Sequence, residues 1–122
     1  MSKVHKYFDR SEFLCNGNKK GICSCGFATV DIELLSVLVD VREHFKKPVK
    51  VYSGCRCDIY NRHVGGAKHS KHKQGIASDI AVEGVSPRTV YKYLIKKYPM
   101  NYGIGSYRNF THIDVRQTKA RW

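Results

Sequence analysis

Apolar residues recur at a helical interval between residues 31 and 45. Those on the repeating face fall at i, i+4, i+7 and i+11: Leu34, Leu38, Val41 and Phe45. This spacing places the four side chains on one side of an α-helix. Asp31 stands where an N-cap residue is expected, and Pro48 prevents the helix from continuing. The pattern therefore predicts an amphipathic helix over 31–45.

A second apolar stripe follows Ser86 and Pro87, a capping residue and a proline suited to the first helical position. Its members again lie on one helical face: Tyr91, Leu94, Ile95 and Tyr98. Pro99 stands directly after the stripe and ends it. We expect a second helix between these prolines.

Alternating or continuous apolar runs predict four short strands, at 49–53, 76–82, 102–107 and 110–116. In the last run Phe110, His112 and Asp114 share one face, because successive side chains of a strand point to opposite sides. The sum is an α+β fold in which two helices pack on a small antiparallel sheet. A chain of 122 residues suits a single domain, 1–122, with one modest core.

The charge balance adds an expectation about partners. The chain has 22 Lys and Arg residues against 10 Asp and Glu, a formal charge of +12. An anionic partner is therefore expected, and nucleic acid, anionic lipid and acidic cell-wall polymers all qualify. No run reaches the roughly 20 apolar residues of a membrane helix, and the first residues lack the apolar stretch of a secretory signal. We expect a monomer that is made in the cytoplasm and spans no membrane.

The five cysteines leave two interpretations open. They stand at 15, 23, 25, 55 and 57, and their odd number excludes a complete disulfide framework within one chain. Residues 15–26 are rich in Gly, Asn and Cys and predict an irregular loop. Either Cys15, Cys23 and Cys25 hold a second, structural metal, or the cysteines are reduced, partly buried thiols.

The segment 69–79 carries the clearest candidate chemistry. His72 lies in a polar, glycine-interrupted loop, and Asp79 follows inside an apolar strand, where a carboxylate is costly unless paired or bound to metal. His112 lies in a similar setting on the last predicted strand. Two histidines and a carboxylate that leave one position to water are typical of catalytic zinc. By spacing alone, a chance His-x6-Asp and an aspartate that caps a turn remain open.

Several motifs carry a family resemblance. They are SGCRC at 53–57, Asn61, GGAKHSKHKQGIASDI at 65–80 and GIGSYRNFTHIDVR at 103–116. In this order and with these gaps they resemble the zinc D-Ala-D-Ala carboxypeptidase type of peptidase family M15. FDRSEF at 8–13 and KPV at 47–49 are similar to the family's opening, so the resemblance covers nearly the whole chain.

The resemblance implies a hedgehog-like or D-Ala-D-Ala-peptidase-like domain with one catalytic Zn²⁺ ion, held by His72, Asp79 and His112. It also implies hydrolysis of peptidoglycan stem peptides. A phage-type endolysin is the expected setting, acting on the cell wall after release or holin-type export. Anionic polymers of the envelope are then the expected partners of the basic surface.

Further roles follow from matching positions. Arg56 is expected to bind a substrate carboxylate or, alternatively, to form a structural salt bridge. Ser70 and Gln74 flank the ligand loop and are expected to contact substrate or to orient ligands. Tyr107 is a candidate for polarising the scissile carbonyl, and a core tyrosine is the alternative.

The general base is less clear from the motifs. Several relatives carry an acid three residues before the last zinc histidine, where this chain has Asn109, which accepts no proton. Asp114 is then a candidate base or an orienting group, and His69 is another candidate.

Two other functions stay open beside the peptidase. A wall-binding or hedgehog-like module would keep the zinc and lack turnover, which Asn109 favours. A nucleic-acid-binding protein would suit the charge, although the lysines are scattered and no specific nucleic acid is expected.

Overall fold

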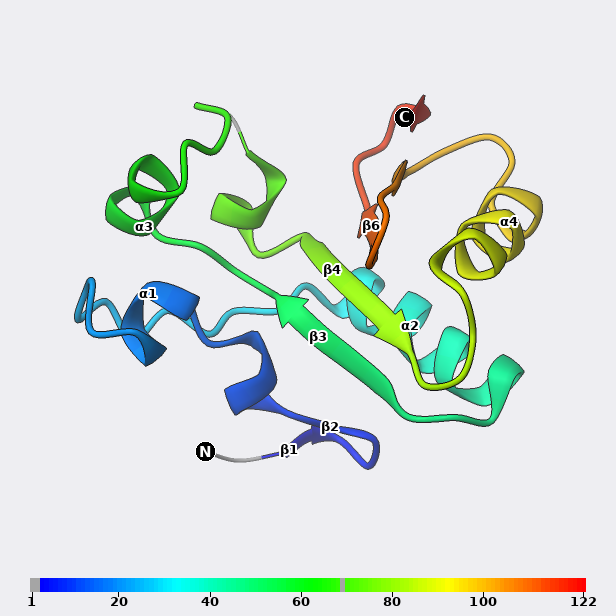
Figure 1. Ribbon diagram of the computed structural model, residues 1–122, viewed down its shortest axis with the longest axis horizontal. Coiled ribbons are helices and arrows are strands. Elements are labelled where there is room, and N and C mark those ends of the chain that lie inside the picture. Colours follow the sequence, from blue (N-terminus) through cyan, green and yellow to red (C-terminus); the bar gives the residue numbers. More distant parts are fainter. Residues whose placement is uncertain (1–2, 69) are drawn as a thin grey trace.

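The computed structural model describes residues 3–68 and 70–122 (Figure 1). His69, one of the candidate bases, lies outside the described residues. The elements in chain order are β1 (Lys3–His5), β2 (Phe8–Asp9), η1 (Arg10–Phe13), α1 (Asn16–Lys19), α2 (Ile32–Phe45), β3 (Val49–Ser53), α3 (Asp58–His63), η2 (Lys71–Gln74), β4 (Ala77–Val82), α4 (Pro87–Lys97), β5 (Gly103–Ser106), β6 (Thr111–Asp114) and β7 (Ala120–Arg121).

Five strands form the main sheet in the order β3-β4-β6-β5-β7. The four strands expected from the sequence pair antiparallel, as predicted. β7 adds a short parallel edge, with Gly103 opposite Ala120, so the whole sheet is mixed. β1 and β2 form a separate antiparallel pair near the N-terminus.

The two expected helices form where the capping signals predict. The Asp31 carboxylate accepts hydrogen bonds from the backbone N–H groups of Glu33 and Leu34, which have no partner within α2. Ser86 caps α4 in the same way, through the N–H of Thr89. Helices α1 and α3 were not expected, because four and six residues are too few to show a helical period. α1 lies inside the predicted irregular loop.

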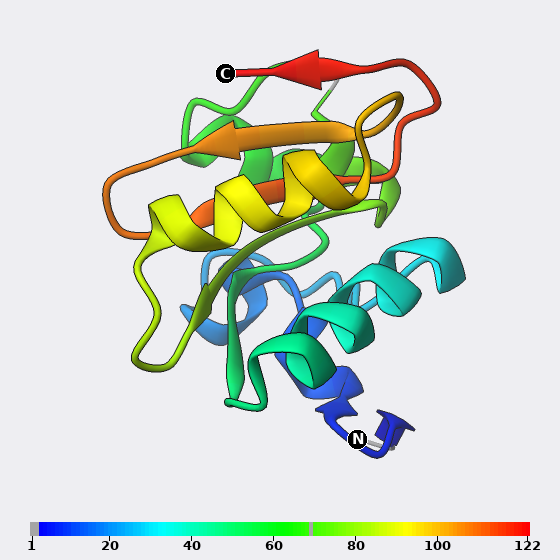
Figure 2. The ribbon, with the colours of Figure 1, turned by 90° about the vertical axis from the view of Figure 1, so that its right-hand side faces the viewer.

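Both long helices cover the same face of the sheet (Figure 2). The core lies between them and the strands, and its residues with 2% exposure or less include Leu34, Val37, Leu38 and Val41 from α2, Val90 and Leu94 from α4, and Ile80, Ile104 and Ile113 from the sheet. Burial of these apolar side chains is the main stabilising contribution, about 25 cal/mol per Å² removed from water. The expected α+β architecture, with helices on a small sheet, is confirmed.

Successive side chains of β6 point to opposite faces of the sheet, of which one packs against the helices and the other is polar. Thr111 and Ile113 face the helices, and the Thr111 hydroxyl donates to the carbonyl of Pro87 at the start of α4. His112 and Asp114 therefore point to the opposite face. Asp79 lies directly across from His112 on β4, so the sheet register brings their side chains together. Within the described parts of the chain, no helix is long and apolar enough to span a membrane.

Replacement of the α2 cap tests this account of the fold. Asp31→Ala leaves the N–H groups of Glu33 and Leu34 without their acceptor, so we expect the free energy of unfolding to fall by about 1 kcal/mol. Urea denaturation followed by circular dichroism measures the change. Ser36→Ala, on the exposed face of the same helix, is the control and should be near neutral. Equal effects of the two substitutions would contradict the capping role.

Candidate metal centre

The three ligands expected for the catalytic zinc meet at the polar face of the sheet. His72 comes from η2, Asp79 from β4 and His112 from β6, and one donor atom from each lies within 4.8 Å of the others. His72 Nε2 is 3.4 Å from one Asp79 oxygen, and His112 Nδ1 is 3.0 Å from the other. The residues His72 and His112 are 4% and 8% exposed, so the cluster lies largely out of water.

The tautomer of His72 follows from its neighbour. Its Nδ1 is 2.7 Å from the backbone oxygen of Gly54, and a carbonyl oxygen only accepts hydrogen bonds. Nδ1 therefore carries a proton, and Nε2 is the ring nitrogen directed at Asp79. A histidine fixed in this way through its other ring nitrogen is the usual arrangement of a metal ligand.

His112 lies between two carboxylates. Its Nε2 is 2.8 Å from Asp114 and its Nδ1 is 3.0 Å from Asp79. Burial opposes a charge on this ring, but hydrogen bonds to Asp114 and Asp79 raise the pKa of His112 above its ordinary value. With Nε2–H donated to Asp114, Nδ1 is the atom available to a metal.

Asp114 is surrounded by donors. The side chain is fully buried and accepts from Arg116 Nε at 2.8 Å and Nη2 at 2.7 Å, besides the backbone N–H groups of Gly103 and Arg116. Burial alone would raise the pKa of this carboxyl, yet the hydrogen bonds from His112 and Arg116 hold it well below its usual range. An acid held so firmly in its charged form orients His112 better than it accepts a proton.

The donor set fits zinc. Burial alone would raise the pKa of Asp79, but hydrogen bonds from His112 and His72 lower it to about 2, so the carboxylate is ionised at neutral pH. Each histidine has one ring nitrogen held by the protein and one directed at Asp79. Two imidazole nitrogens and one carboxylate oxygen match the ligands of catalytic zinc sites with an open fourth position.

Two glycines of β5 make room for this arrangement. A Cβ added to Gly103 would lie 2.6 Å from Arg116 Nε and 2.7 Å from an Asp114 oxygen. A Cβ at Gly105 would lie 2.6 Å from the Trp122 indole. The Gly-Ile-Gly of the sequence motif therefore allows Asp114, Arg116 and Trp122 to pack directly on the strand.

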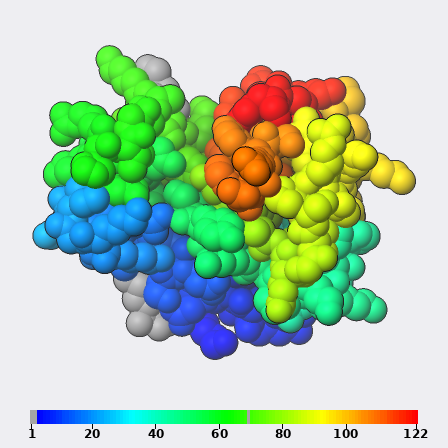
Figure 3. Space-filling model, in the orientation of Figure 1, coloured from blue at the N-terminus to red at the C-terminus, as the bar shows by residue number. Residues whose placement is uncertain are grey.

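A cavity of about 420 Å³ opens beside the cluster. It lies between the segment that contains α3 and η2 and the segment that follows α4, which are green and orange to red in Figure 3. Besides the three candidate ligands, its polar and aromatic lining includes Arg56, Ser70, Lys71, Tyr107, Arg116 and Trp122. Asp79 is the only acidic residue of that lining among residues 3–68 and 70–122, so the cavity is basic overall.

Arg56 combines burial with unused hydrogen-bonding capacity. Its Nη1 donates to the buried side chain of Asn61 at 2.9 Å, which fixes the guanidinium. Its Nε is buried and has no hydrogen-bond partner in the described part of the chain. Burial lowers the pKa of Arg56, and the charge of Asp79 opposes this change. The structure shows no Arg56 salt bridge among the described residues, which favours the carboxylate-binding alternative.

Tyr107 lies at the rim of the cavity. Its ring stacks on Phe110, with centroids 4.6 Å apart, and its hydroxyl accepts from Trp122 Nε1 at 2.8 Å. The hydroxyl hydrogen therefore remains available for donation. With 43% exposure, Tyr107 is not the core tyrosine that the sequence left open.

The other residues singled out in the sequence differ in whether they reach this cavity. Ser70 lines the cavity, and its hydroxyl accepts from the backbone N–H of His72, so it helps to place that ligand. Gln74 is exposed and lines a different cavity, beside Asp31, so the structure does not bring it to the metal cluster. Asn109 is exposed in the turn between β5 and β6 and is not part of the cavity lining.

Trp122 is the residue that sequence reasoning missed. Its ring lies 5.0 Å from that of His112, and Arg116 lies over its face. The short strand β7 places it there by pairing with β5. A two-residue strand outside the motifs carried no signal from which this position could be predicted.

Comparison with known proteins adds one finding. The sequence profile of a family described as Peptidase M15 matches residues 6–114. No curated protein and no solved structure matches the chain.

Substitution of Gly105 tests the packing around His112. In Gly105→Ala the new methyl group would overlap the indole of Trp122, so we expect the indole to move and its fluorescence emission to shift to longer wavelength. The signal is unambiguous because the chain has one tryptophan. Ser106→Ala, the next residue of the strand, retains the backbone bond to Trp122 and serves as the control. Unchanged emission in Gly105→Ala would refute the contact.

Proposed function

The chain belongs to peptidase family M15, and on that premise we propose that it is a zinc-dependent peptidase acting on the stem peptides of bacterial peptidoglycan. The observation that carries the proposal is the cluster of His72, Asp79 and His112, in which each histidine has one ring nitrogen held by another group and the other directed at Asp79. We propose one peptidase domain over 1–122, working as a monomer. The motifs at 53–57, 65–80 and 103–116 support the D-Ala-D-Ala carboxypeptidase or endopeptidase type.

The protein groups prepare this site for hydrolysis. Gly54 and Asp114 fix the two imidazoles, and Asp79 supplies the negative charge. A zinc ion held there would polarise the scissile carbonyl and lower the pKa of a water in the fourth position. Largely buried ligands strengthen such electrostatic effects, because little water competes with them.

The basic cavity supports an anionic peptide as substrate. We propose that Arg56 binds a carboxylate of the stem peptide, since its guanidinium is held by Asn61 and its Nε is unpaired. Tyr107 donates its hydroxyl hydrogen toward the carbonyl that is cleaved. Ser70 places His72, and Asp114 is a positioning residue for His112 rather than the general base.

A phage-type endolysin is the biological role that we propose for this peptidase. It would be made in the cytoplasm and reach the wall after release or export. The net charge of +12 would hold it near anionic polymers of the envelope.

One observation favours a second candidate, a zinc-containing wall-binding module without turnover. Asn109 replaces the acid of several relatives, and among the described cavity residues Asp79 is the only acid. A nucleic-acid-binding role rests on charge alone and predicts metal-independent, salt-sensitive binding to a duplex.

The decisive experiment is mass spectrometry of purified peptidoglycan after incubation with the protein. We expect new peptide fragments or free D-alanine that disappear when a chelator removes the metal, and their masses identify the cleaved bond. His72→Ala should be inactive because it lacks one proposed ligand. His63→Ala, an exposed histidine of α3, should retain activity.

Two outcomes would contradict the zinc-peptidase proposal. Fragments that persist with the chelator would exclude metal dependence. A protein that binds zinc and releases nothing would place the binding module first.

Arg56→Lys tests substrate recognition separately from metal binding. Lysine keeps the charge but lacks the planar guanidinium with its paired N–H donors. We therefore expect kcat/KM on the peptidoglycan peptide identified by mass spectrometry to fall about ten- to a hundredfold. Zinc content should stay unchanged, because Arg56 is not a ligand. Arg62→Lys, on the exposed side of α3, is the matched control. An unaltered kcat/KM would remove Arg56 from the binding site.

A further inference from the structure

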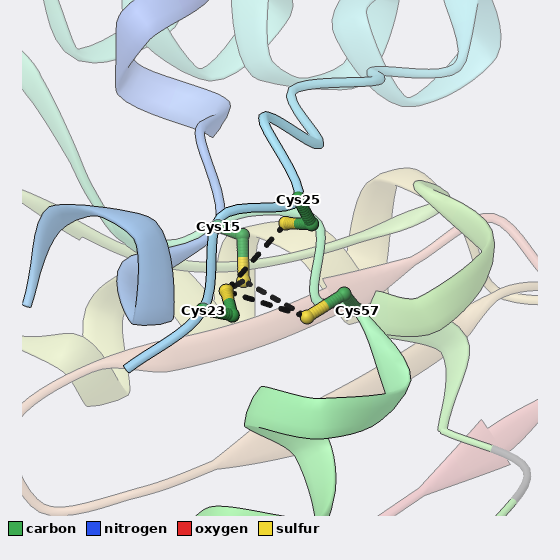
Figure 4. Close-up of side chains that lie close together, drawn as sticks. All are labelled: Cys15, Cys23, Cys25 and Cys57. Carbon is green, nitrogen blue, oxygen red and sulfur yellow. Dashed lines mark hydrogen bonds between the residues drawn. The ribbon is translucent and has the colours of Figure 1, made fainter. Parts of the chain in front are cut away.

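Four of the five cysteines converge on one point (Figure 4), as a group separate from the cluster of His72, Asp79 and His112. Cys15 follows η1, Cys23 and Cys25 lie in the loop after α1, and Cys57 precedes α3. Their sulfur atoms all lie within 4.8 Å of one another. Segments separated by more than thirty residues in the chain thus bring their thiols together.

Four of the six sulfur–sulfur distances are close to the edge of a zinc tetrahedron, and the other two are at most 4.8 Å. Cys15 Sγ is 3.9 Å from Cys23 Sγ and from Cys57 Sγ, and Cys23 Sγ is 3.6 Å from Cys25 Sγ and 3.5 Å from Cys57 Sγ. Zinc bound at a Zn–S distance of about 2.3 Å requires sulfurs about 3.8 Å apart. These contacts are close to that edge length without any movement of the chain.

Disulfide pairing does not explain the cluster. A disulfide joins two sulfurs at about 2.05 Å and leaves them apart from others. Here Cys23 is near three partners at once, and no pair is closer than 3.5 Å. The arrangement has one common centre instead of two separate pairs (Figure 4).

The backbone around the cluster supports charged sulfur. The N–H of Phe27 donates to Cys25 Sγ at 3.3 Å, and that of Tyr60 donates to Cys57 Sγ at 3.4 Å. Hydrogen bonds of this kind stabilise thiolates, the form in which cysteine binds a metal.

Cys55 shows the contrast within the same segment. Its Sγ donates to the carbonyls of Phe13 at 3.1 Å and Phe27 at 2.9 Å, so it remains a protonated thiol with satisfied hydrogen bonding. It is buried and does not belong to the group of four. Within the Cys-Arg-Cys sequence, Cys55 is thus part of the packed interior, whereas Cys57 belongs to the cluster.

We propose that Cys15, Cys23, Cys25 and Cys57 bind a second zinc ion in a closed, structural site. Four thiolate ligands leave no open position, which distinguishes it from the three-ligand centre. The sequence indicated three of these ligands as one alternative, and Cys57 completes the set.

The location of this site suggests what it stabilises. Residues 23–31 contain no regular secondary structure, so a metal would tie this loop to the segment before α3. The same segment provides the Gly54 carbonyl that holds His72, and its Arg56 N–H donates to the His72 carbonyl at 2.9 Å. The link to catalysis rests on the proposed function, whereas metal binding by the cysteines does not.

Metal counting tests the proposal. Protein purified under reducing conditions should contain about two zinc ions per chain by elemental analysis and native mass spectrometry. Cys23→Ser should lose one ion, and His72→Ala should lose the other. Cys55→Ser, the matched control, should retain both. A wild-type ion that Cys23→Ser retains and His72→Ala removes would overturn the cysteine site, as would a wild type that binds no zinc. A single ion that only Cys23→Ser removes would instead support the cysteine site and count against the His72, Asp79 and His112 centre.

Cobalt substitution gives a readout that can be taken on the wild-type protein. Cobalt bound by thiolates shows intense sulfur-to-metal charge-transfer bands, whereas the His-Asp-His centre does not. We expect these bands in the wild type and in His72→Ala, so their presence is independent of the proposed peptidase site. Absence of these bands would overturn the cysteine site. So would iron at the cysteines in elemental analysis, or a protein mass that is lower by two hydrogen atoms for each disulfide between them.

Discussion

The imidazole of His112 is held between two carboxylates, and much of the remaining structure depends on that contact. Asp79 lies opposite it across the β4–β6 register, while Asp114 follows two residues later on the same face. The buried Asp114 and the half-buried Asp79 both contact this ring, and two like charges at one site would repel without compensation. His112 lies between them, and Arg116 neutralises Asp114 by a two-pronged contact. Gly103 is required because any side chain there would occupy the space of this pair.

The two faces of the sheet differ in role: one stabilises the fold, and the other carries the polar groups of the candidate site. One face packs under α2 and α4, so the strands are fixed by apolar burial that does not depend on the polar groups. The opposite face can then carry charged groups in a defined register. The segment 54–57 joins this face to the cysteine cluster, because it holds His72 through Gly54 and ends in Cys57. This segment thus positions a ligand that comes from the short helix η2 and not from a strand.

Local signals predicted much of this structure, and tertiary contacts account for what they missed. The caps Asp31 and Ser86 act within one turn, so the sequence places both helices to within about a residue. The candidate ligands His72, Asp79 and His112 also lie in recognisable motifs, and the fold brings them together. Trp122 could not be predicted as part of the cavity, since only the pairing of β7 with β5 brings it there. Gln74 flanks the ligand loop in sequence, but η2 turns it toward another cavity.

The two arginines of the cavity differ in how far their charge is already compensated. Arg116 lines the cavity, but its charge is already matched by Asp114, so its attraction for a further carboxylate is reduced. Arg56 is held by the neutral side chain of Asn61 and forms no ion pair among the described residues. Its charge is therefore the less compensated of the two, and its partial burial limits competition from water. This contrast supports our proposal that Arg56 binds the acidic group of the substrate, while Arg116 acts through Asp114 on the orientation of His112.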